Sequence, residues 1–261
     1  MDPQNLYVVF KPLSLFTADL DLVSQDHAPA RVSCSSDTVA DLTITAGFTN
    51  WDRSPKNSFL LASDGSMSPD LSGLGRYVFG QYHSELRNPP TFQVQSGAPA
   101  TFTASIASVA DSGGRLRILV DGVAALDQAV QQDTAYSVVV PAGSHAILVD
   151  NDGLDWIEIP EYTLSGAYPA LRSFAMQSPD QLFGWAENRN YNWKRVLAQG
   201  LPGEVIHGQI QIDAVPDRTW TLDWYSCATG EKLSSEAVVS TGGQLRFPVP
   251  AFTWDLAYRI Y

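Results

Sequence analysis

Residues 136–165 read YSVVVPAGSHAILVDNDGLDWIEIPEYTLS, and this stretch decides the fold class. Val138–Val140 and Ala146–Val149 are short apolar runs that contain β-branched residues, which is typical of strands. Pro141–Gly143 lies between them and supplies residue types that favour a turn. We therefore expect the two runs to form a β-hairpin.

A second turn is expected at Asp150–Gly153, because Asn and Gly both tolerate positive φ. A third strand is expected from Trp156 to Leu164, and the loop before it carries polar side chains. The sequence VVPAGSHAILVDNDGLDWIEI within this stretch resembles the last strands of β-sandwich carbohydrate-binding modules of the family 6 and family 35 type. Such modules are attached to polysaccharide-degrading enzymes, so the resemblance implies a sandwich fold and a sugar ligand.

The composition predicts a folded acidic protein. A chain of 261 residues with 44% hydrophobic content can build one large domain or two ordinary ones around a real core. Its net charge of -12 leaves no basic surface to neutralise phosphates, so we expect neither nucleic acid nor a membrane as a partner. The seven tryptophans suit stacking on sugars, although large cores also use such residues.

The chain has no obvious targeting or membrane segment. No stretch approaches the ~18 consecutive apolar residues of a membrane-spanning helix. The first residues, MDPQN, lack the basic region and the apolar core of a signal peptide, so an export signal is either removed or was never present. The resemblance to polysaccharide-degrading enzymes implies that the parent protein is secreted or extracellular.

Two cysteines, Cys34 and Cys227, are too few and too far apart in sequence for a disulfide framework or a cysteine-based metal site. Two buried thiols are the simplest interpretation. A single disulfide remains an alternative if the protein is extracellular, where thiols are oxidised.

The amino-terminal residues 1–27 predict a short helical segment. Apolar residues recur at spacings of three and four, and Pro12 is expected to break the helix; these residues are Leu6, Val9, Phe10, Leu13, Phe16 and Leu20. The segment resembles the last helix of the (β/α) barrel in multimodular, cellulase-like glycoside hydrolases, in which a β-sandwich follows the barrel. The resemblance implies that a catalytic barrel precedes Met1 in the parent protein.

Two series of short alternating strands follow, separated by Gly, Asp and Pro, and they predict an all-β fold with two antiparallel, jelly-roll-like sandwiches. In the second series, LFGWAENRNYNW at 182–193 and WTLDWYSCATGE at 220–231 resemble the small β-sandwich behind the barrel in the same enzymes. That resemblance implies a sandwich without chemistry of its own.

The predicted strand at Ala30–Cys34 has no obvious partner in the first series of strands. We therefore expect a nested arrangement, in which residues 28–39 and 166–261 form one small sandwich. Residues 40–165 would then be an inserted carbohydrate-binding jelly roll. Insertions of this kind are tolerated because the termini of a domain usually lie close together.

Candidate ligand-binding residues gather on and near the loop before the last strand of the inserted module. A sugar needs a flat apolar ring against its C–H face and planar amides or carboxylates for its hydroxyls. Trp156, with Asn151 and Asp155, meets that need. Trp51, Tyr77 and Tyr82, together with His83 and Asn88, could line the same or another face. The alternative is that the aromatic residues are packed in the core and that Asp and Asn only satisfy turn amides.

No cofactor is expected, and a structural calcium ion remains open. The resembling modules carry calcium, but this chain has no Glu-x-Glu before its first strand, where Asp41 and Asp52 are the nearest acids. Asp150, Asp152 and Asp155 offer oxygen ligands without the remainder of an EF-hand loop.

Catalysis is the competing hypothesis. A glycosidase needs two carboxylates roughly 5 to 10 Å apart, and the sequence offers several acids without a recognisable catalytic pattern; these are Asp155, Glu158, Glu161, Glu187 and Asp223. We therefore expect a non-catalytic region of a polysaccharide hydrolase that binds β-glucan or a related plant polysaccharide. The alternatives are a small glycoside hydrolase with an Asp/Glu pair on a β-sandwich scaffold, and a structural spacer without a ligand.

Overall fold

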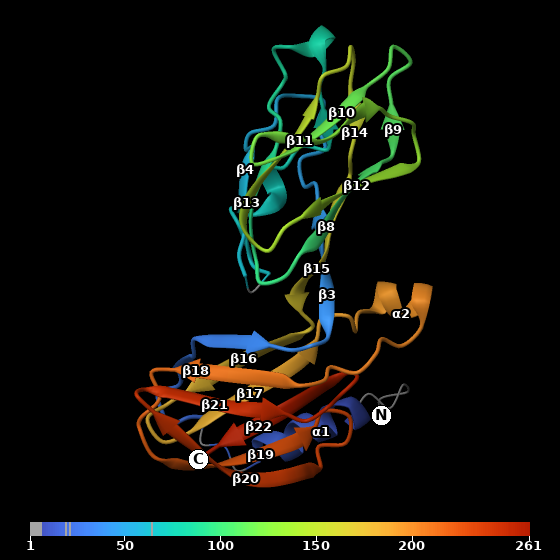
Figure 1. Ribbon diagram of the computed structural model, residues 1–261. Coiled ribbons are helices and arrows are strands. Elements are labelled where there is room, and N and C mark those ends of the chain that lie inside the picture. Colours follow the sequence, from blue (N-terminus) through green and yellow to red (C-terminus); the bar gives the residue numbers. More distant parts are fainter. Residues whose placement is uncertain (1–6, 19, 21, 64) are drawn as a thin grey trace. The chain divides into compact units, whose positions relative to one another are not determined.

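The computed structural model describes residues 7–18, 20, 22–63 and 65–261, and it divides the chain into two compact units (Figure 1). Unit 1 comprises residues up to Val39 together with Pro169–Tyr261, and unit 2 comprises Ala40–Tyr168. Both units are built from mainly antiparallel β-sheets, so the predicted all-β class is confirmed. Within the described residues, no helix is long and apolar enough to cross a membrane.

Unit 1 contains one continuous sheet in the order β1-β16-β17-β22-β19-β20-β21-β18-β2. Its strands are β1 (Ala28–Pro29), β2 (Val32–Ser35), β16 (Leu171–Gln177), β17 (Leu182–Asn188), β18 (Gly208–Asp213), β19 (Thr219–Ser226), β20 (Lys232–Thr241), β21 (Gln244–Val249) and β22 (Asp255–Ile260). β2 pairs with β18, with Cys34 opposite Ile210. The strand predicted at Ala30–Cys34 therefore lies in the sheet of the carboxy-terminal residues.

The core of unit 1 is aromatic. The ring centroid of Trp224 lies 6.0 Å from that of Phe247 and 5.4 Å from that of Tyr258. Tyr258 also explains the glycine in β17, because a Cβ on Gly184 would lie 2.3 Å from the Tyr258 ring. The two cysteines form no disulfide, and burial, with help from the Asp255 charge, raises the pKa of the Cys227 thiol to about 12.

The described residues of unit 1 include two helices, α1 (Tyr7–Thr17) and α2 (Trp193–Gln199). The predicted break at Pro12 is wrong, because α1 continues through this residue. Packing against the sheet holds the helix in place: the Phe16 ring lies 5.4 Å from that of Tyr225, and Arg259 Nη2 donates to the Leu15 carbonyl at 3.2 Å. Leu6, part of the predicted apolar stripe, lies outside the described residues.

The strands that the structure describes in unit 2 form three sheets, in the orders β11-β10-β13-β7-β4-β5, β12-β8-β15-β3 and β6-β14-β9. Its strands and short 3-10 helices are β3 (Val39–Thr45), β4 (Ser58–Leu61), β5 (Met67–Ser68), η1 (Leu71–Gly73), β6 (Tyr77–Val78), η2 (Gln81–His83), β7 (Thr91–Ser96), β8 (Ala100–Ile106), β9 (Ser108–Val109), β10 (Arg115–Val120), β11 (Val123–Ala129), β12 (Thr134–Val140), β13 (Gly143–Asn151), β14 (Ile157–Glu158) and β15 (Glu161–Pro169). The larger two sheets enclose one core that includes Phe59, Phe92, Phe102 and Tyr162.

The hairpin predicted around Pro141–Gly143 is wrong. β12 pairs with β8, whereas β13 pairs with β7 and β10 in the other sheet. Val138 and Ile147 both lie in the core between the sheets, so the chain changes sheets at this turn. A hairpin does join β10 to β11 through Asp121 and Gly122, whose φ values are 52° and 80°, as a type I′ turn requires.

The third predicted strand, from Trp156 to Leu164, is divided in two. β14 pairs with β6 and β9, and β15 pairs with β8. Pro160 lies between them and has no N–H for a ladder, which favours the change of sheet. The turn before β14 also differs from the prediction, because neither Asn151 nor Gly153 has a positive φ.

Candidate functional site

Four rings of unit 2 meet the ring of Trp51, which follows β3. The Trp51 centroid lies 5.0 Å from that of Tyr77 in β6 and 5.0 Å from that of Phe79. It lies 5.5 Å from that of His83 in η2 and 5.7 Å from that of Trp156, which precedes β14. The planes of these four rings make angles of 64° to 90° with that of Trp51. We call these five residues the Trp51 cluster.

The Trp51 cluster reaches from the core to the surface. Phe79 is only 3% exposed, whereas Trp51 is 48% exposed. Tyr77 and Trp156 are half-buried between these extremes. Because edge-to-face contacts of this kind are favourable and directional, the buried rings fix the orientation of the exposed indole.

Asp155 fixes the polar side of the cluster. Its Oδ1 accepts from the Trp156 backbone N–H at 2.9 Å and lies 3.0 Å from His83 Nε2, and its Oδ2 accepts from Ser112 Oγ at 2.7 Å. The hydrogen bond from Ser112 lowers the pKa of Asp155; burial opposes this effect, and the Trp156 N–H and His83 add to it. An ionised carboxylate can only accept, so His83 Nε2 is the donor in its contact with Asp155.

The buried side chain of Asn151 holds the backbone of the loop before β14 in place. It is 0% exposed, its Oδ1 accepts from the N–H groups of Arg115 at 3.0 Å and Gly153 at 2.9 Å, and its Nδ2 donates to the carbonyls of Val78 and Asp155. We expected residues with positive φ to form this turn, but the hydrogen bonds of the Asn151 side chain stabilise it instead. It also ties the loop to β6, which carries Tyr77.

A close backbone contact reinforces this attachment. A Cβ on Gly80 would lie 2.5 Å from the carbonyl oxygens of both Gly153 and Asp155. Only glycine allows this approach. The Gln81 N–H donates to the Gly153 carbonyl and the Tyr82 N–H to the Leu154 carbonyl, at 3.0 Å and 2.8 Å. The segment after β6 and the loop before β14 are therefore held together, which brings their aromatic residues into one cluster.

The structure brings together five of the candidate residues from the sequence: Trp51, Tyr77, His83, Trp156 and Asp155. Tyr82 lies on the adjoining segment and is 61% exposed, while Asn151 is buried beneath the loop. Two contributors were not predicted from the sequence: Phe79, which packs against Trp51, and Ser112, which donates to Asp155. Phe79 stands two residues after Tyr77 in an apolar run, which could have indicated it, whereas no sequence signal indicates Ser112.

Three of the five acids considered for catalysis form ion pairs with a lysine or an arginine. Glu158 lies 2.8 Å from Arg76 and Asp223 lies 3.1 Å from Lys232, while Glu187 pairs with Arg172. Burial raises the pKa of Asp223, but hydrogen bonds from neighbours that include Lys232 outweigh this effect and leave the pKa lowered. Asp155 and Asp223 are thus held in the ionised form, whereas a general acid needs a raised pKa.

No metal-binding group of three or more His, Cys, Asp or Glu side chains occurs among the residues that the structure describes. Two of the three acids considered for calcium have basic partners close by. Arg87 Nη2 donates to both oxygens of Asp150 at 2.9 Å, and Arg117 lies 3.6 Å from Asp152. The bonds from Arg87 occupy both oxygens of Asp150, which a calcium ion would need, whereas the contact of Asp152 is a longer surface pair.

Comparisons with known proteins assign no family. No protein-family model matches the chain, and no curated protein matches it. A cycloisomaltooligosaccharide glucanotransferase from Paenibacillus sp. is similar over 90% of this chain and 45% of its own, with 10% identity and a TM-score of 0.26. Latent PorU from Porphyromonas gingivalis is similar over 91% of this chain and 21% of its own, with 12% identity and a TM-score of 0.34. Tandem CBM51 modules of a family 98 glycoside hydrolase from Streptococcus pneumoniae are similar over 88% of this chain and 94% of their own, with 10% identity and a TM-score of 0.28.

The chain spans less than half the length of the first two of these structures. At such TM-scores and identities, the similarities assign neither a family nor a function to the chain.

Proposed function

We propose that unit 2 is a non-catalytic carbohydrate-binding module in the ancillary region of a secreted polysaccharide-degrading glycoside hydrolase, and that its ligand is β-glucan or a related plant polysaccharide. The observation that carries the proposal is the Trp51 indole, 48% exposed and surrounded by the rings of its cluster. A pyranose offers an apolar C–H face, and a fixed flat ring is the side chain that matches it.

Pre-organisation strengthens this argument. Binding loses affinity when a side chain must be immobilised, at a cost of about 0.5 to 1.5 kcal/mol for each flexible group. Trp51 is already held by Tyr77, Phe79 and Trp156, so little of this cost remains. A ring fixed in this way can stack on a sugar without reordering the loop.

Each residue of the site has a distinct role in the proposal. Trp51 stacks on the sugar, and the exposed Tyr82 contributes a second contact beside it. Tyr77 and Trp156 support the Trp51 ring, and Asp155 positions Trp156 through its backbone N–H. Asn151 forms the turn and touches no ligand.

A binding role fits the remaining features better than hydrolysis does. Asp155 lies at the cluster, but its lowered pKa suits a fixed acceptor and not a general acid. The net charge of -12 disfavours polyanionic partners and leaves neutral glycans as the matching class. We retain a catalytic barrel of the parent protein as the expected partner of this region.

Calorimetry against soluble glucans, xylans and mannans tests the proposal, with native protein and with the Trp51→Ala and Trp156→Ala variants. We expect Trp51→Ala to weaken binding by about ten-fold or more, because loss of a stacking ring removes about 1 to 3 kcal/mol. Trp156→Ala should weaken binding too, through loss of support for Trp51. Trp193→Ala, which removes a 70% exposed tryptophan from α2, is the matched control and should bind like native protein.

Circular dichroism must show that each variant is folded. A native protein that binds none of these glycans would make the region a spacer and contradict the proposal. Equal binding by native protein and folded Trp51→Ala would contradict the assigned site. Release of reducing sugar that disappears in a Glu158→Gln variant would favour the hydrolase.

A further inference from the structure

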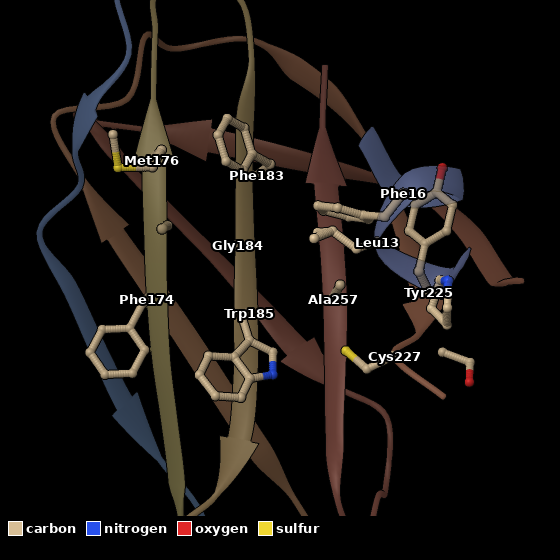
Figure 2. A pocket seen from close by; sticks show the side chains of 13 residues that line it. Leu13, Phe16, Phe174, Met176, Phe183, Gly184, Trp185, Tyr225, Cys227 and Ala257 are labelled. Atoms are coloured by element: carbon tan, nitrogen blue, oxygen red, sulfur yellow. The ribbon is translucent and has the colours of Figure 1, made fainter. Parts of the chain in front are cut away.

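A pair of exposed rings, separate from the Trp51 cluster, lies on the outer face of the unit 1 sheet. Phe174 in β16 stands opposite Trp185 in β17, and the two side chains are 51% and 41% exposed. Their ring centroids are 6.2 Å apart and their planes differ by 25°. Figure 2 shows the two rings side by side on the same face of the sheet. We call this pair the Phe174–Trp185 platform.

The platform borders an apolar groove of about 350 Å³. Leu13 and Phe16 of α1 and Tyr225 of β19 line the side opposite the platform (Figure 2). Ala257 in β22 stands opposite both Trp185 and Tyr225 in the strand register. Because its side chain is small, the groove stays open between the Phe174–Trp185 platform on one side and Phe16 and Tyr225 on the other.

Polar groups hold both exposed rings in place. Trp185 Nε1 donates to Asp255 Oδ2 at 3.0 Å, and the Arg172 guanidinium lies 5.0 Å from the centroid of the Phe174 ring. Glu187 accepts from Arg172 Nε and forms an ion pair with it. A carboxylate has about four lone-pair sites, so both acids keep acceptor capacity beyond these contacts.

We propose that the Phe174–Trp185 platform is a second saccharide-binding surface, with Asp255, Glu187 and Arg172 hydrogen-bonding the hydroxyls at its edge. Two nearly parallel rings in one row match the C–H faces of successive pyranose units, and the pair is fixed before the ligand arrives. The charges indicate a neutral glycan: Glu187 neutralises Arg172, and Asp255 repels an acidic sugar. This surface lies in the other unit and does not depend on the Trp51 cluster.

The chemistry of the groove supports reversible binding without a covalent step. Cys227 lines the groove, and burial together with the Asp255 charge raises the pKa of its thiol to about 12. The thiol therefore stays protonated near neutral pH and is a poor nucleophile. The hydrogen-bonding groups at the edge of the platform distinguish this surface from a purely apolar one.

Calorimetric stoichiometry of the full chain tests this inference, with cellohexaose, xylohexaose and mannohexaose as ligands. We expect native protein to bind two molecules of the preferred hexaose, and Trp185→Ala and Trp51→Ala to bind one each. The double variant should bind none. Phe174→Leu keeps an apolar side chain but removes the ring, and it should weaken the second site by about ten-fold. Trp193→Ala should still bind two.

The outcomes separate this inference from the proposed function. If Trp51→Ala abolishes all binding and Trp185→Ala binds like native protein, the platform is not a sugar site and only the proposed function stands. If Trp185→Ala alone loses binding, the platform stands and the Trp51 site fails. Native protein that binds none of the hexaoses overturns both. Self-association in light scattering that Trp185→Ala abolishes, with sugar stoichiometry unchanged, would assign the face to contacts between copies and overturn the inference.

Discussion

The Trp51 cluster and the Phe174–Trp185 platform present aromatic surface in two different ways. In the cluster the rings cross that of Trp51 at 64° to 90°, and exposure is unequal: Trp51 is 48% exposed and Phe79 only 3%. In the platform the two planes differ by 25° and both side chains stay about half exposed. The cluster is assembled from loops and strand ends, whereas the platform is set by the pairing of two adjacent strands.

This difference decides what each surface depends on. Strand register alone places Phe174 opposite Trp185, so the platform needs only an intact sheet. The Trp51 cluster needs the loop before β14 to be held against the segment after β6 by buried polar groups. Changes in those groups should therefore alter the cluster and leave the platform as it is.

Asn151→Ala is expected to have the largest effect on the Trp51 cluster while it leaves the platform unchanged. The variant removes a fully buried amide and leaves the N–H groups of Arg115 and Gly153 and the carbonyl of Val78 without this partner. Buried groups without partners cost about 1 to 3 kcal/mol each, so unit 2 should lose about 3 kcal/mol or more of unfolding free energy. Urea unfolding followed by tryptophan fluorescence measures the loss.

Asp152→Ala is the matched control for Asn151→Ala. Its side chain is 45% exposed, and its 3.6 Å pair with Arg117 is a surface contact, so the expected change is within about 0.5 kcal/mol. A similar small loss for Asn151→Ala would show that the loop does not depend on this amide. Loss of sugar binding at the platform in Asn151→Ala would contradict the independence of the two surfaces.

A smaller, pH-dependent effect is expected from Ser112→Ala. The pKa of Asp155 is lowered from 3.8 in the folded state, first by the bond from Ser112. A lowered carboxyl pKa contributes stability that is present above the unfolded value and is lost as the pH falls through the folded value. Without Ser112 the pKa of Asp155 should rise toward 3.8, and part of this contribution should disappear.

The stability of native protein and of Ser112→Ala should therefore differ most near neutral pH and converge in acid. Urea midpoints measured from roughly pH 6 to pH 2 test this expectation. A difference that stays constant through the acidic range would mean that Asp155 is not the group through which Ser112 acts. The platform, which does not contain Asp155, should show no corresponding change in sugar binding.

Local sequence patterns predicted most strands but not which strands meet. The strand predicted at Ala30–Cys34, for example, forms as β2. The hairpin predicted around Pro141–Gly143 does not form. Core-facing side chains alternate along two strands in the same way whether the strands pair within one sheet or face each other across a sandwich, so alternation does not show which arrangement occurs. The Asp121-Gly122 dipeptide was the better hairpin signal.

The site was predictable by residue type and not by geometry. The aromatic rings of Trp51, Tyr77 and Trp156 indicate a sugar site, but no local pattern indicates that their three distant segments converge. The Asn151 amide suits either a sugar or the backbone of a turn, and the structure shows that backbone groups occupy it. The platform was hidden for the same reason, since the sequence does not give the register that pairs Phe174 with Trp185.

The central claim is that Trp51 contacts a sugar, and NMR of the tryptophan indole N–H groups tests it most directly. The chain has seven tryptophans, and substitution by Phe assigns each signal. On titration with the preferred hexaose, we expect the Trp51 signal to shift together with that of Trp185, while the buried Trp220 and Trp224 signals stay unchanged. Saturating sugar that leaves the Trp51 signal in place would contradict the account.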